Sequence, residues 1–275
     1  MATSDNPDND TSSATTNQSV TMSARILGEL ANSPQALGVT ELARRLDESK
    51  ARIFRHLATM KQVGFVSQEQ AGDEYRLGWN IYRLGIAAAE QFSLTRVAQR
   101  HMTALRDQTQ ETAALAVPAS GDALVMASVQ SERQISLSVK EGVVIAANSS
   151  ALGRVLLAFA PPALQKRVLA RPLKAFSPAS IVEPAQLQAR LDFVQEHWWE
   201  IAVNENAYGI STLAAPVFDE RNSILAAVAV VMPSMAASQA PDPALVRAVQ
   251  DCAAAISADF NATAWTQRRE AAAKA

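Results

Sequence analysis

The sequence is poor in the residues that metal and thiol chemistry require. Its 275 residues include one cysteine, Cys252, and three histidines, His56, His101 and His197. A lone cysteine excludes a disulfide within the chain and suits a reducing compartment, and its alanine-rich surroundings indicate a small buried apolar residue. No histidine lies in an HExxH motif, and Cys252 has no neighbouring base, so the sequence predicts neither a metal site nor a thiol nucleophile.

Other signatures of enzymes are also missing. The chain contains no GxGxxG motif, and its segment GRVLLAF is not a phosphate-binding loop. No nucleophile-elbow motif supports a serine hydrolase, although a Ser–His–Asp site assembled from distant residues stays open. The sequence therefore favours a protein that is not an enzyme and that needs no cofactor.

Long apolar runs are absent. No segment approaches the roughly 18 uninterrupted apolar residues of a membrane helix. The first 20 residues carry acids, serines, threonines and asparagines where a signal peptide would have basic and then apolar residues. We therefore expect a disordered tail over residues 1–20, no membrane partner and a cytoplasmic location.

The chain has no bulk positive charge either, since 25 basic residues face 27 acidic ones. Affinity for a polyanion would have to come from a local patch. Residues 49–62 form such a patch, because they include no acid and four basic residues, Lys50, Arg52, Arg55 and Lys61. On a helical projection Arg52, Arg55, Thr59 and Gln62 lie opposite the apolar stripe. A solvated surface and a nucleic-acid surface both fit this pattern.

The neighbouring segments favour nucleic acid. The patterns predict helices over 23–32 and 41–46, the second capped by Thr40, and a third that begins at the cap Ser49 and ends at Gly64. Strand-like runs at 65–68 and 74–77 flank a turn at 71–73, which predicts a hairpin. Three short helices and a hairpin are the layout of a winged helix-turn-helix, here over residues 21–78, whose third helix enters the major groove of double-stranded DNA.

The residues of the third helix differ in their expected contacts. Ser49 and Lys50, in the first turn, are expected to hold phosphate at the positive end of the helix dipole. Ala51 permits close approach to a base, and Arg52 and Arg55 are long enough to read guanine or to grip phosphate. The complete predicted set of DNA contacts is Thr40, Ser49, Lys50, Ala51, Arg52, Arg55, His56 and Thr59.

The rest of the chain predicts a linker and a second domain. Residues 79–92 read as a linker helix with more apolar surface than one small module covers, which predicts a homodimer. Residues 93–265 alternate strands (113–119, 123–130, 135–141, 211–220, 223–233) with helices (150–160, 163–170, 184–198, 243–265), and 266–275 read as a tail. This pattern is typical of an α+β domain around an antiparallel sheet.

Four segments of the chain resemble IclR-type bacterial transcriptional regulators. They are ELARRLDESKARIFRHLATMKQVGFV, YRLG, NSSALGRVLLAFAPP and YGISTLAAPVFDE, in that order along the chain. The resemblance implies an N-terminal winged helix, a connecting helix and a C-terminal effector-binding domain of GAF/profilin-like topology. It also implies dimers that often pair into tetramers, and a small organic acid as effector.

The resemblance also implies where the effector pocket lies. It points to residues 148–154, to the segment 209–212 and to the last strand of the sheet. Free backbone N–H groups at the start of the 150–160 helix, beside the hydroxyls of Ser149 and Ser150, suit a carboxylate, although Ser150 could equally be only a helix cap. The expected effector contacts are Met126, Asn148, Ser149, Ser150, Ala151, Leu152, Gly153, Ile210, Thr212, Ala229 and Val231.

The chain departs from the family pattern in this pocket. Members that bind small polar acids carry a cysteine, an acidic residue and serines where this chain has Thr212, Ala202, Ala229 and Val231. The loss of polar groups, with Met126 as further apolar lining, favours an aromatic carboxylate. We therefore expect a ligand-responsive repressor or activator of a catabolic operon. A regulator that senses an aliphatic acid and an effector-independent DNA-binding protein remain alternatives.

Overall fold

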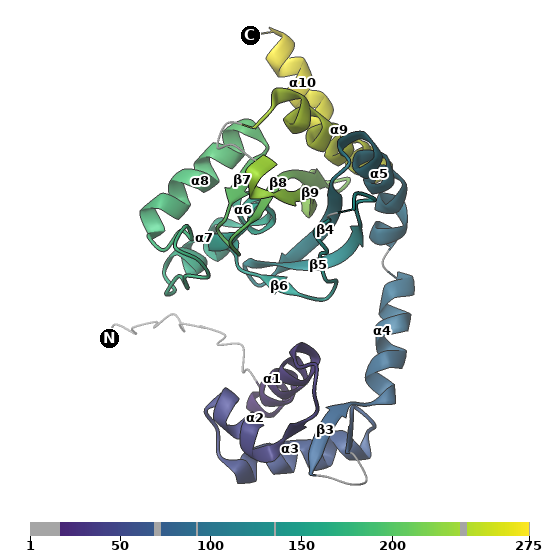
Figure 1. The fold of residues 1–275 in the computed structure, drawn as a ribbon, viewed down its shortest axis with the longest axis vertical. Helices are drawn as coiled ribbons and strands as arrows, with labels where there is room; N and C mark the ends of the chain where they lie inside the picture. Colours follow the sequence, from purple (N-terminus) through teal and green to yellow (C-terminus); the bar gives the residue numbers. More distant parts are fainter. Residues whose placement is uncertain (1–16, 69–72, 92, 135, 237–240, 275) are drawn as a thin grey trace, which may run out of the picture. The chain divides into compact units, whose positions relative to one another are not determined.

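The computed structural model describes residues 17–68, 73–91, 93–134, 136–236 and 241–274. These residues divide into two compact units on either side of residue 92. Both units combine helices with antiparallel strands (Figure 1), which confirms the predicted α+β fold class.

The first unit contains the three predicted short helices and the predicted hairpin. Its elements are α1 (Gln18–Asn32), β1 (Leu37–Gly38), α2 (Val39–Leu46), α3 (Lys50–Gln62), β2 (Val66–Gln68), β3 (Glu74–Leu77) and α4 (Trp79–Gln91). The three strands form an antiparallel sheet in the order β1-β3-β2. Ile26 of α1, Leu42 of α2 and Leu57 of α3 are fully buried together, so the apolar stripes of the three helices make one core.

Three expectations for this unit need correction. Helix α1 begins at Gln18 and not near residue 23, because the Asn17 side chain accepts from the N–H groups of Ser19 and Val20. Residues 17–20 of the predicted tail are thus ordered, while residues 1–16 lie outside the described residues, as do positions 71 and 72 of the predicted turn. Thr40 is not a cap, since α2 starts at Val39 after Gly38 with no side-chain cap.

The second unit is built on one six-stranded antiparallel sheet. Its strands are β4 (Thr112–Ala119), β5 (Asp122–Val129), β6 (Val144–Ile145), β7 (Glu200–Val203), β8 (Ile210–Phe218) and β9 (Ile224–Pro233), in the order β6-β5-β4-β9-β8-β7. Its helices are α5 (Ser93–Thr109), α6 (Ala151–Ala158), α7 (Pro162–Leu169), α8 (Pro184–His197), α9 (Pro243–Asp259) and α10 (Ala264–Lys274), with 3-10 turns η1 (Ala147–Ser149) and η2 (Ser234–Ala236). The sequence patterns did not predict β7.

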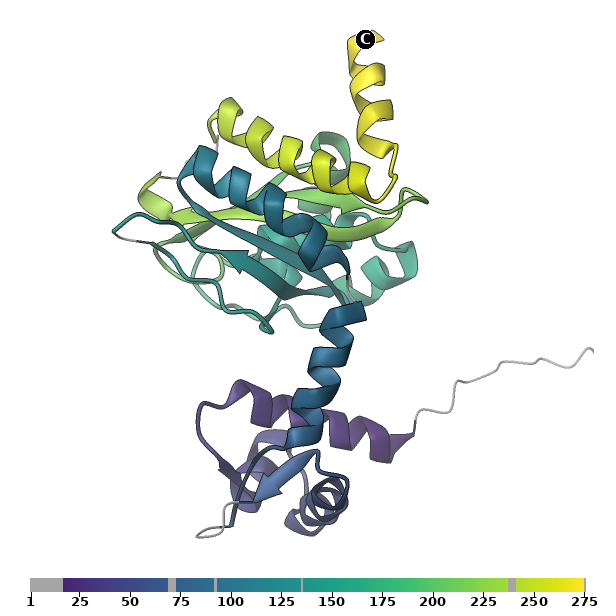
Figure 2. The same ribbon diagram turned by 90° about the vertical axis from the view of Figure 1, so that its right-hand side faces the viewer.

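Each face of this sheet is covered by helices. Helices α5 and α9 lie side by side across one face (Figures 1 and 2), and α6 packs on the other with α8 behind it. The core under α9 includes Cys252, whose burial raises the pKa of the thiol to about 12. This agrees with its interpretation as a small buried apolar residue. The helices within the described ranges all fall short of the length and apolar character of a membrane span.

The predicted strand over residues 135–141 is wrong. Residues 136–140 are irregular, residue 135 lies outside the described residues, and β6 forms later, at Val144–Ile145. Side chains hold this segment beside the sheet: Thr112 donates to the Leu137 carbonyl (2.6 Å) and Ser128 to the Val139 carbonyl (3.1 Å). The backbone N–H of Ser128 donates to the Glu141 carboxylate, so a strand ladder cannot form there.

The predicted helix over 243–265 is two helices, and the predicted tail over 266–275 is helical as far as Lys274. Asn261 adopts a left-handed conformation with φ of 59° and ends the run of α9. The Asn222 side chain then accepts from the N–H groups of Thr263 and Ala264, both at 2.9 Å. A residue some forty positions away along the chain thus caps α10.

Trp265 anchors α10 to the sheet. Its indole is buried, contacts Trp198 edge to face and donates to the Pro216 carbonyl at 3.0 Å. We predict that Trp265→Ala lowers the free energy of unfolding of this unit by about 3–5 kcal/mol, the usual cost of a large buried aromatic. Urea unfolding monitored by circular dichroism measures this. Tyr208→Ala, at a side chain that is 90% exposed, should change it by less than about 0.5 kcal/mol.

Candidate nucleic-acid interface and ligand cavity

The turn between α2 and α3 is fixed by local hydrogen bonds. Asp47 adopts a left-handed conformation, and the N–H of Glu48 donates to the Ala43 carbonyl at 2.9 Å. Ser49 then caps α3 by accepting from the N–H of Arg52 at 3.3 Å, as predicted. At the other end, Gly64 has a φ of 71° and ends α3, which confirms its predicted role as a C-terminal cap.

Helix α3 exposes a face that carries positive charge. Ala51, Arg55 and Thr59 point away from the core, and Lys50 flanks them in the first turn. The side chains of Lys50 and Arg55 have no ion pair with any described residue. Phe54, which was not among the predicted DNA contacts, lies beside Lys50 and Ala51 and is 56% exposed. This face therefore offers the cations of Lys50 and Arg55 and the ring of Phe54, and Lys61, which donates to the Gln68 amide oxygen at 2.8 Å, lies beside Phe54 in the same groove.

Arg52 lies at the edge of this face and lines a groove with Arg55, His56 and Thr59. It is half-buried on the flank of α3, where its guanidinium contacts both carboxylate oxygens of Glu48 at 3.0 Å. Glu48 also lies 3.8 Å from the guanidinium of Arg25 on α1. The signal was present in the sequence, because an acid four residues before an arginine favours this pair on a helix. Arg52 is thus 33% exposed, as an outward position allows, but its guanidinium is already paired with Glu48.

The remaining predicted DNA contacts lie on either side of α3. His56 is half-buried, and its Nδ1 lies 3.1 Å from the Ser23 hydroxyl of α1. Thr40 is exposed and lines a groove with Lys50, Ala51, Phe54 and Lys61. The structure therefore brings Thr40 to the Lys50 side of α3 and places His56 on the Arg52 side.

The basic residues of α2 add little to this positive face. Arg44 and Arg45 both donate to the Glu41 carboxylate, at distances from 2.6 to 2.9 Å. Hydrogen bonds from these two arginines, Arg44 first, lower the pKa of Glu41 to about 2. Glu41 therefore remains ionised at neutral pH and offsets part of their charge.

In the second unit, the turn before α6 is tightly packed. Ser150 caps α6 by accepting from the N–H of Gly153 at 3.0 Å. A Cβ atom added at Gly153 would lie 2.6 Å from the Cα atom of Ala147, so only glycine lets η1 fold back against α6. The N–H groups of Ala151 and Leu152, in the first turn, have no partner within the helix. The start of α6 thus presents backbone donors beside the hydroxyls of Ser149 and Ser150.

A cavity of about 200 Å³ opens next to this turn. Six of its lining residues were predicted from the sequence as effector contacts: Ser149, Ser150, Leu152, Ile210, Thr212 and Val231. Ala202, whose small side chain was noted in the sequence, lines it as well. Segments that are distant in the sequence therefore meet at one cavity between α6 and the sheet.

The other predicted effector contacts do not line the cavity. The Asn148 amide donates to the carbonyls of Lys174 and Ile181, at 2.9 and 2.8 Å, and so holds a loop in place. Ala151 and Ala229 are fully buried core residues. Gly153 packs on Ala147, and Met126 on β5 is also absent from the cavity wall.

Half of the cavity wall was not predicted. It comes from the irregular segment after β5, from β6 and from the loop between β7 and β8, through Leu137, Ser138, Val139, Lys140, Val143, Ile145, Glu205 and Asn206. The first segment was predicted as a strand, and the loop carries no motif. Alternating apolar residues at 137, 139, 143 and 145 were the available signal, but periodicity does not show what they pack against.

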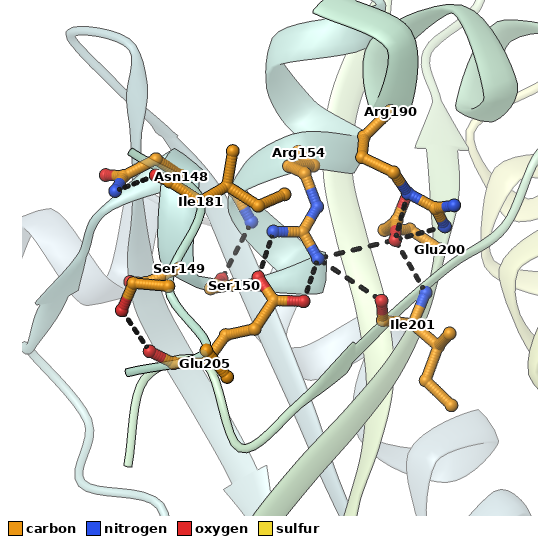
Figure 3. A network of polar contacts seen from close by, with 12 residues as sticks. Asn148, Ser149, Ser150, Arg154, Ile181, Arg190, Glu200, Ile201 and Glu205 are labelled. Carbon is orange, nitrogen blue, oxygen red and sulfur yellow. Dashed lines mark hydrogen bonds and ion pairs between the residues drawn. The ribbon is translucent and has the colours of Figure 1, made fainter. Parts of the chain in front are cut away.

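A buried ion network lies directly behind this wall. Figure 3 shows the Arg154 guanidinium of α6 between two carboxylates, those of Glu205 and Glu200, with Arg190 of α8 beyond Glu200. Arg154 donates to both oxygens of Glu205, at 2.6 and 3.0 Å, and to Glu200 at 3.3 Å. Burial disfavours the charge of Arg154, but the two carboxylates outweigh it and raise the pKa of the guanidinium. The network contains two cations and two anions and is neutral.

The close approach of Gly153 to the backbone of Ala147 leaves no room for a side chain. Gly153→Ala should destabilise the second unit by about 1–3 kcal/mol, because the added methyl group must displace backbone atoms of η1. Gly28→Ala is a matched control in the first unit, since an added Cβ in α1 meets nothing within 4 Å and should stabilise by about 0.4–1 kcal/mol. Chemical denaturation of both variants measures the two effects. Equal effects of the same sign would contradict the packing described here.

Both units match models of known protein families. Residues 19–70 match the IclR helix-turn-helix domain, and residues 86–258 match the bacterial transcriptional regulator IclR C-terminal domain. The chain is 30% identical over 247 residues to the glycerol operon regulatory protein of Streptomyces coelicolor, covering 89% of this chain and 97% of that protein.

Solved structures share the fold. An IclR transcriptional regulator from Alicyclobacillus acidocaldarius has a TM-score of 0.74 at 25% identity, covering 90% of this chain and 100% of that one. An IclR homologue from Microbacterium hydrocarbonoxydans complexed with 4-hydroxybenzoate has a TM-score of 0.71 at 21% identity, covering 88% and 98%. The first unit is thus a helix-turn-helix domain and the second a ligand-binding domain. The chain belongs to the IclR family of bacterial transcriptional regulators.

Proposed function

We propose that this regulator binds operator DNA through α3 and responds to a small aromatic carboxylate held in the cavity beside α6, acting in the cytoplasm on a catabolic operon. The observation that carries the proposal is the cavity itself, of about 200 Å³, which joins the first turn of α6 to apolar side chains of the sheet. Such a site combines a polar end with apolar walls, as small-molecule sites usually do.

The size of the cavity favours a single ring. An apolar cavity of about 150 Å³ is sufficient to hold benzene. A cavity of about 200 Å³ leaves room for one ring and a carboxylate but not for a second ring. Its apolar lining consists of Leu137, Val139, Val143, Ile145, Leu152, Ala202, Ile210 and Val231. A two-carbon acid would leave most of this apolar surface in contact with water, which disfavours the aliphatic alternative.

The polar end suits the carboxylate. The N–H groups at the start of α6 and the hydroxyl-bearing residues Ser149, Ser150 and Thr212 lie at this end of the cavity. Glu205 also lines this cavity, but the bidentate pair of its carboxylate with Arg154 offsets its charge. Lys140 at the exposed edge has no ion pair with a described residue and adds positive potential. The 4-hydroxybenzoate complex of a similarly folded IclR homologue supports a ligand of this size.

On the DNA side, Arg55 is the residue that we assign to base recognition. It is exposed, unpaired and central on the outward face of α3, next to Ala51 and Thr59. Lys50 and Ser49, in the first turn, are assigned to phosphate. Arg52 would have to leave Glu48 before it reached DNA, so its assigned role is secondary.

A homodimer is part of the proposal. Helix α4 exposes Trp79, Tyr82, Leu84 and Ile86, an unusual amount of apolar surface for a free helix. Burial of this surface against a second copy would pair two DNA-binding units with two half-sites. A tetramer remains an expectation from the family resemblance.

Isothermal titration calorimetry of the full-length protein tests the effector. We expect benzoate to bind more tightly than glyoxylate or pyruvate, with a negative heat-capacity change from apolar burial. Ile210→Glu, which adds a negative charge to the wall, should weaken benzoate at least tenfold. Tyr208→Ala, an exposed neighbour outside the wall, is the control. Equal or tighter binding of the two aliphatic acids would rule out the aromatic assignment.

Binding to specific and random DNA tests the roles on α3. Arg55→Ala should cost about 1–3 kcal/mol on the operator and relax the preference at particular base pairs, whereas Lys50→Ala should weaken all sequences alike. Arg52→Ala should have a smaller effect on specificity than Arg55→Ala, because Arg52 is paired with Glu48. Gel-shift titrations on the DNA upstream of the gene measure this. If Arg55→Ala reduced affinity equally for both kinds of DNA, α3 would not read bases through Arg55.

A further inference from the structure

Glu205 places a carboxylate in the wall of the cavity, whose other charged lining residue is the exposed Lys140. The side chain of Glu205 is 12% exposed, and Glu205 lines this cavity and also a second one beside Arg190 and Val203. Its backbone is fixed, because the hydroxyls of Ser177 and Ser180 donate to its carbonyl at 3.0 and 2.6 Å. The carboxylate is therefore held in one place by its main chain and by Arg154 (Figure 3).

The hydrogen bonds of this carboxylate are incomplete. Two carboxylate oxygens offer about four acceptor positions, and the guanidinium of Arg154 uses two of them. Arg154 is the one donor to this carboxylate among the described residues. A ligand hydroxyl can occupy one of the remaining acceptor positions, whereas an apolar group placed against this carboxylate leaves them unsatisfied, which is costly.

We propose that Glu205 is a specificity-determining residue, which accepts a hydrogen bond from a hydroxyl group of the effector and so selects hydroxylated aromatic acids over unsubstituted ones. This inference rests on the proposed function, since it assumes that an aromatic acid occupies the cavity. The ligand then has two polar contacts of opposite kind: its carboxylate accepts from the first turn of α6, and its hydroxyl donates to Glu205. The apolar walls contact the ring between them.

The charge balance of the network predicts how a substitution at Glu205 changes ligand preference. Arg154 and Arg190 together balance Glu200 and Glu205, so the network as a whole carries no net charge. Glu205→Gln removes one anion and leaves the guanidinium of Arg154 in excess. The variant wall should attract anions more strongly and should no longer favour a hydroxyl donor through charge. The wild-type and variant proteins are therefore expected to rank ligands differently, which a loss of stability alone would not cause.

The test is calorimetry of the full-length protein with benzoate, the three hydroxybenzoate isomers and the methylbenzoates substituted at the same positions. The methyl group is close in size to the hydroxyl group but donates no hydrogen bond. We expect at least one hydroxybenzoate to bind the wild-type protein about tenfold or more tightly than its methyl counterpart, as is usual for a hydrogen bond to a charged acceptor. If no isomer shows this preference while benzoate binds, the inference is wrong and the proposed function stands.

The variants complete the test. In Glu205→Gln the preference for the hydroxybenzoate over its methyl counterpart should fall to about threefold or less, while benzoate should bind more tightly. An unchanged preference would overturn the role of Glu205. Glu196→Gln, at a side chain that is 78% exposed, should leave every preference as in the wild type. Should Glu205→Gln fail to fold, Glu205→Asp, which keeps the charge but withdraws it from the cavity, should also lower the preference. If no aromatic acid bound the wild-type protein, the proposed function itself would fail.

Discussion

Arg154 is a guanidinium with no exposed surface, and the arrangement of the ligand-binding domain depends on how its charge is compensated. A buried cation is tolerated only when anions and hydrogen bonds replace water. Glu200 at the start of β7 and Glu205 in the following loop supply the anions, and the Ile201 carbonyl accepts a further hydrogen bond. Removal of one partner from such a group typically costs about 3–5 kcal/mol. The network therefore ties α6, β7 and the loop between β7 and β8 into a single body.

The same constraint shapes the ligand cavity. Arg154 lies one turn after Ser150 on α6. The carboxylates that neutralise Arg154 must therefore approach the side of α6 where the effector's carboxylate is proposed to bind. Glu205 thereby becomes part of the cavity wall. The domain thus places the Glu205 carboxylate, whose charge is balanced by Arg154, next to the N–H groups at the start of α6. These N–H groups are the donors that suit the carboxylate of the effector. Ligand preference and the stability of the domain are coupled through one side chain.

The DNA-binding unit uses ion pairs differently. There Glu41 and Glu48 hold Arg44, Arg45 and Arg52 near the surface, where such pairs contribute little to stability. Lys50, Arg55 and Lys61 of α3 remain without an ion pair among the described residues. A chain with slightly more acidic than basic residues can present a positive surface in this way, because its acids pair with basic residues elsewhere.

The sequence by itself determined the features that depend on neighbours a few residues apart. The periodicity of α3, its cap Ser49, the terminating Gly64 and the strands β4, β5, β8 and β9 follow from spacings and local conformational preferences. The order of recognisable segments also indicated the family and the fold. Even the pair of Glu48 and Arg52 could have been predicted, since it joins residues one turn apart.

Tertiary structure decided the features in which distant residues satisfy one another's polar groups. Asn222 caps α10 from a turn in the sheet, side chains of β4 and β5 hold residues 136–140 out of a strand, and Glu205 reaches Arg154 from another loop. Alternating apolar residues near 137–145 carry no information on whether they pair as a strand or line a cavity. Local propensity determines where a segment is regular, whereas the partners of buried charges and unpaired backbone groups are determined only when the whole chain has packed.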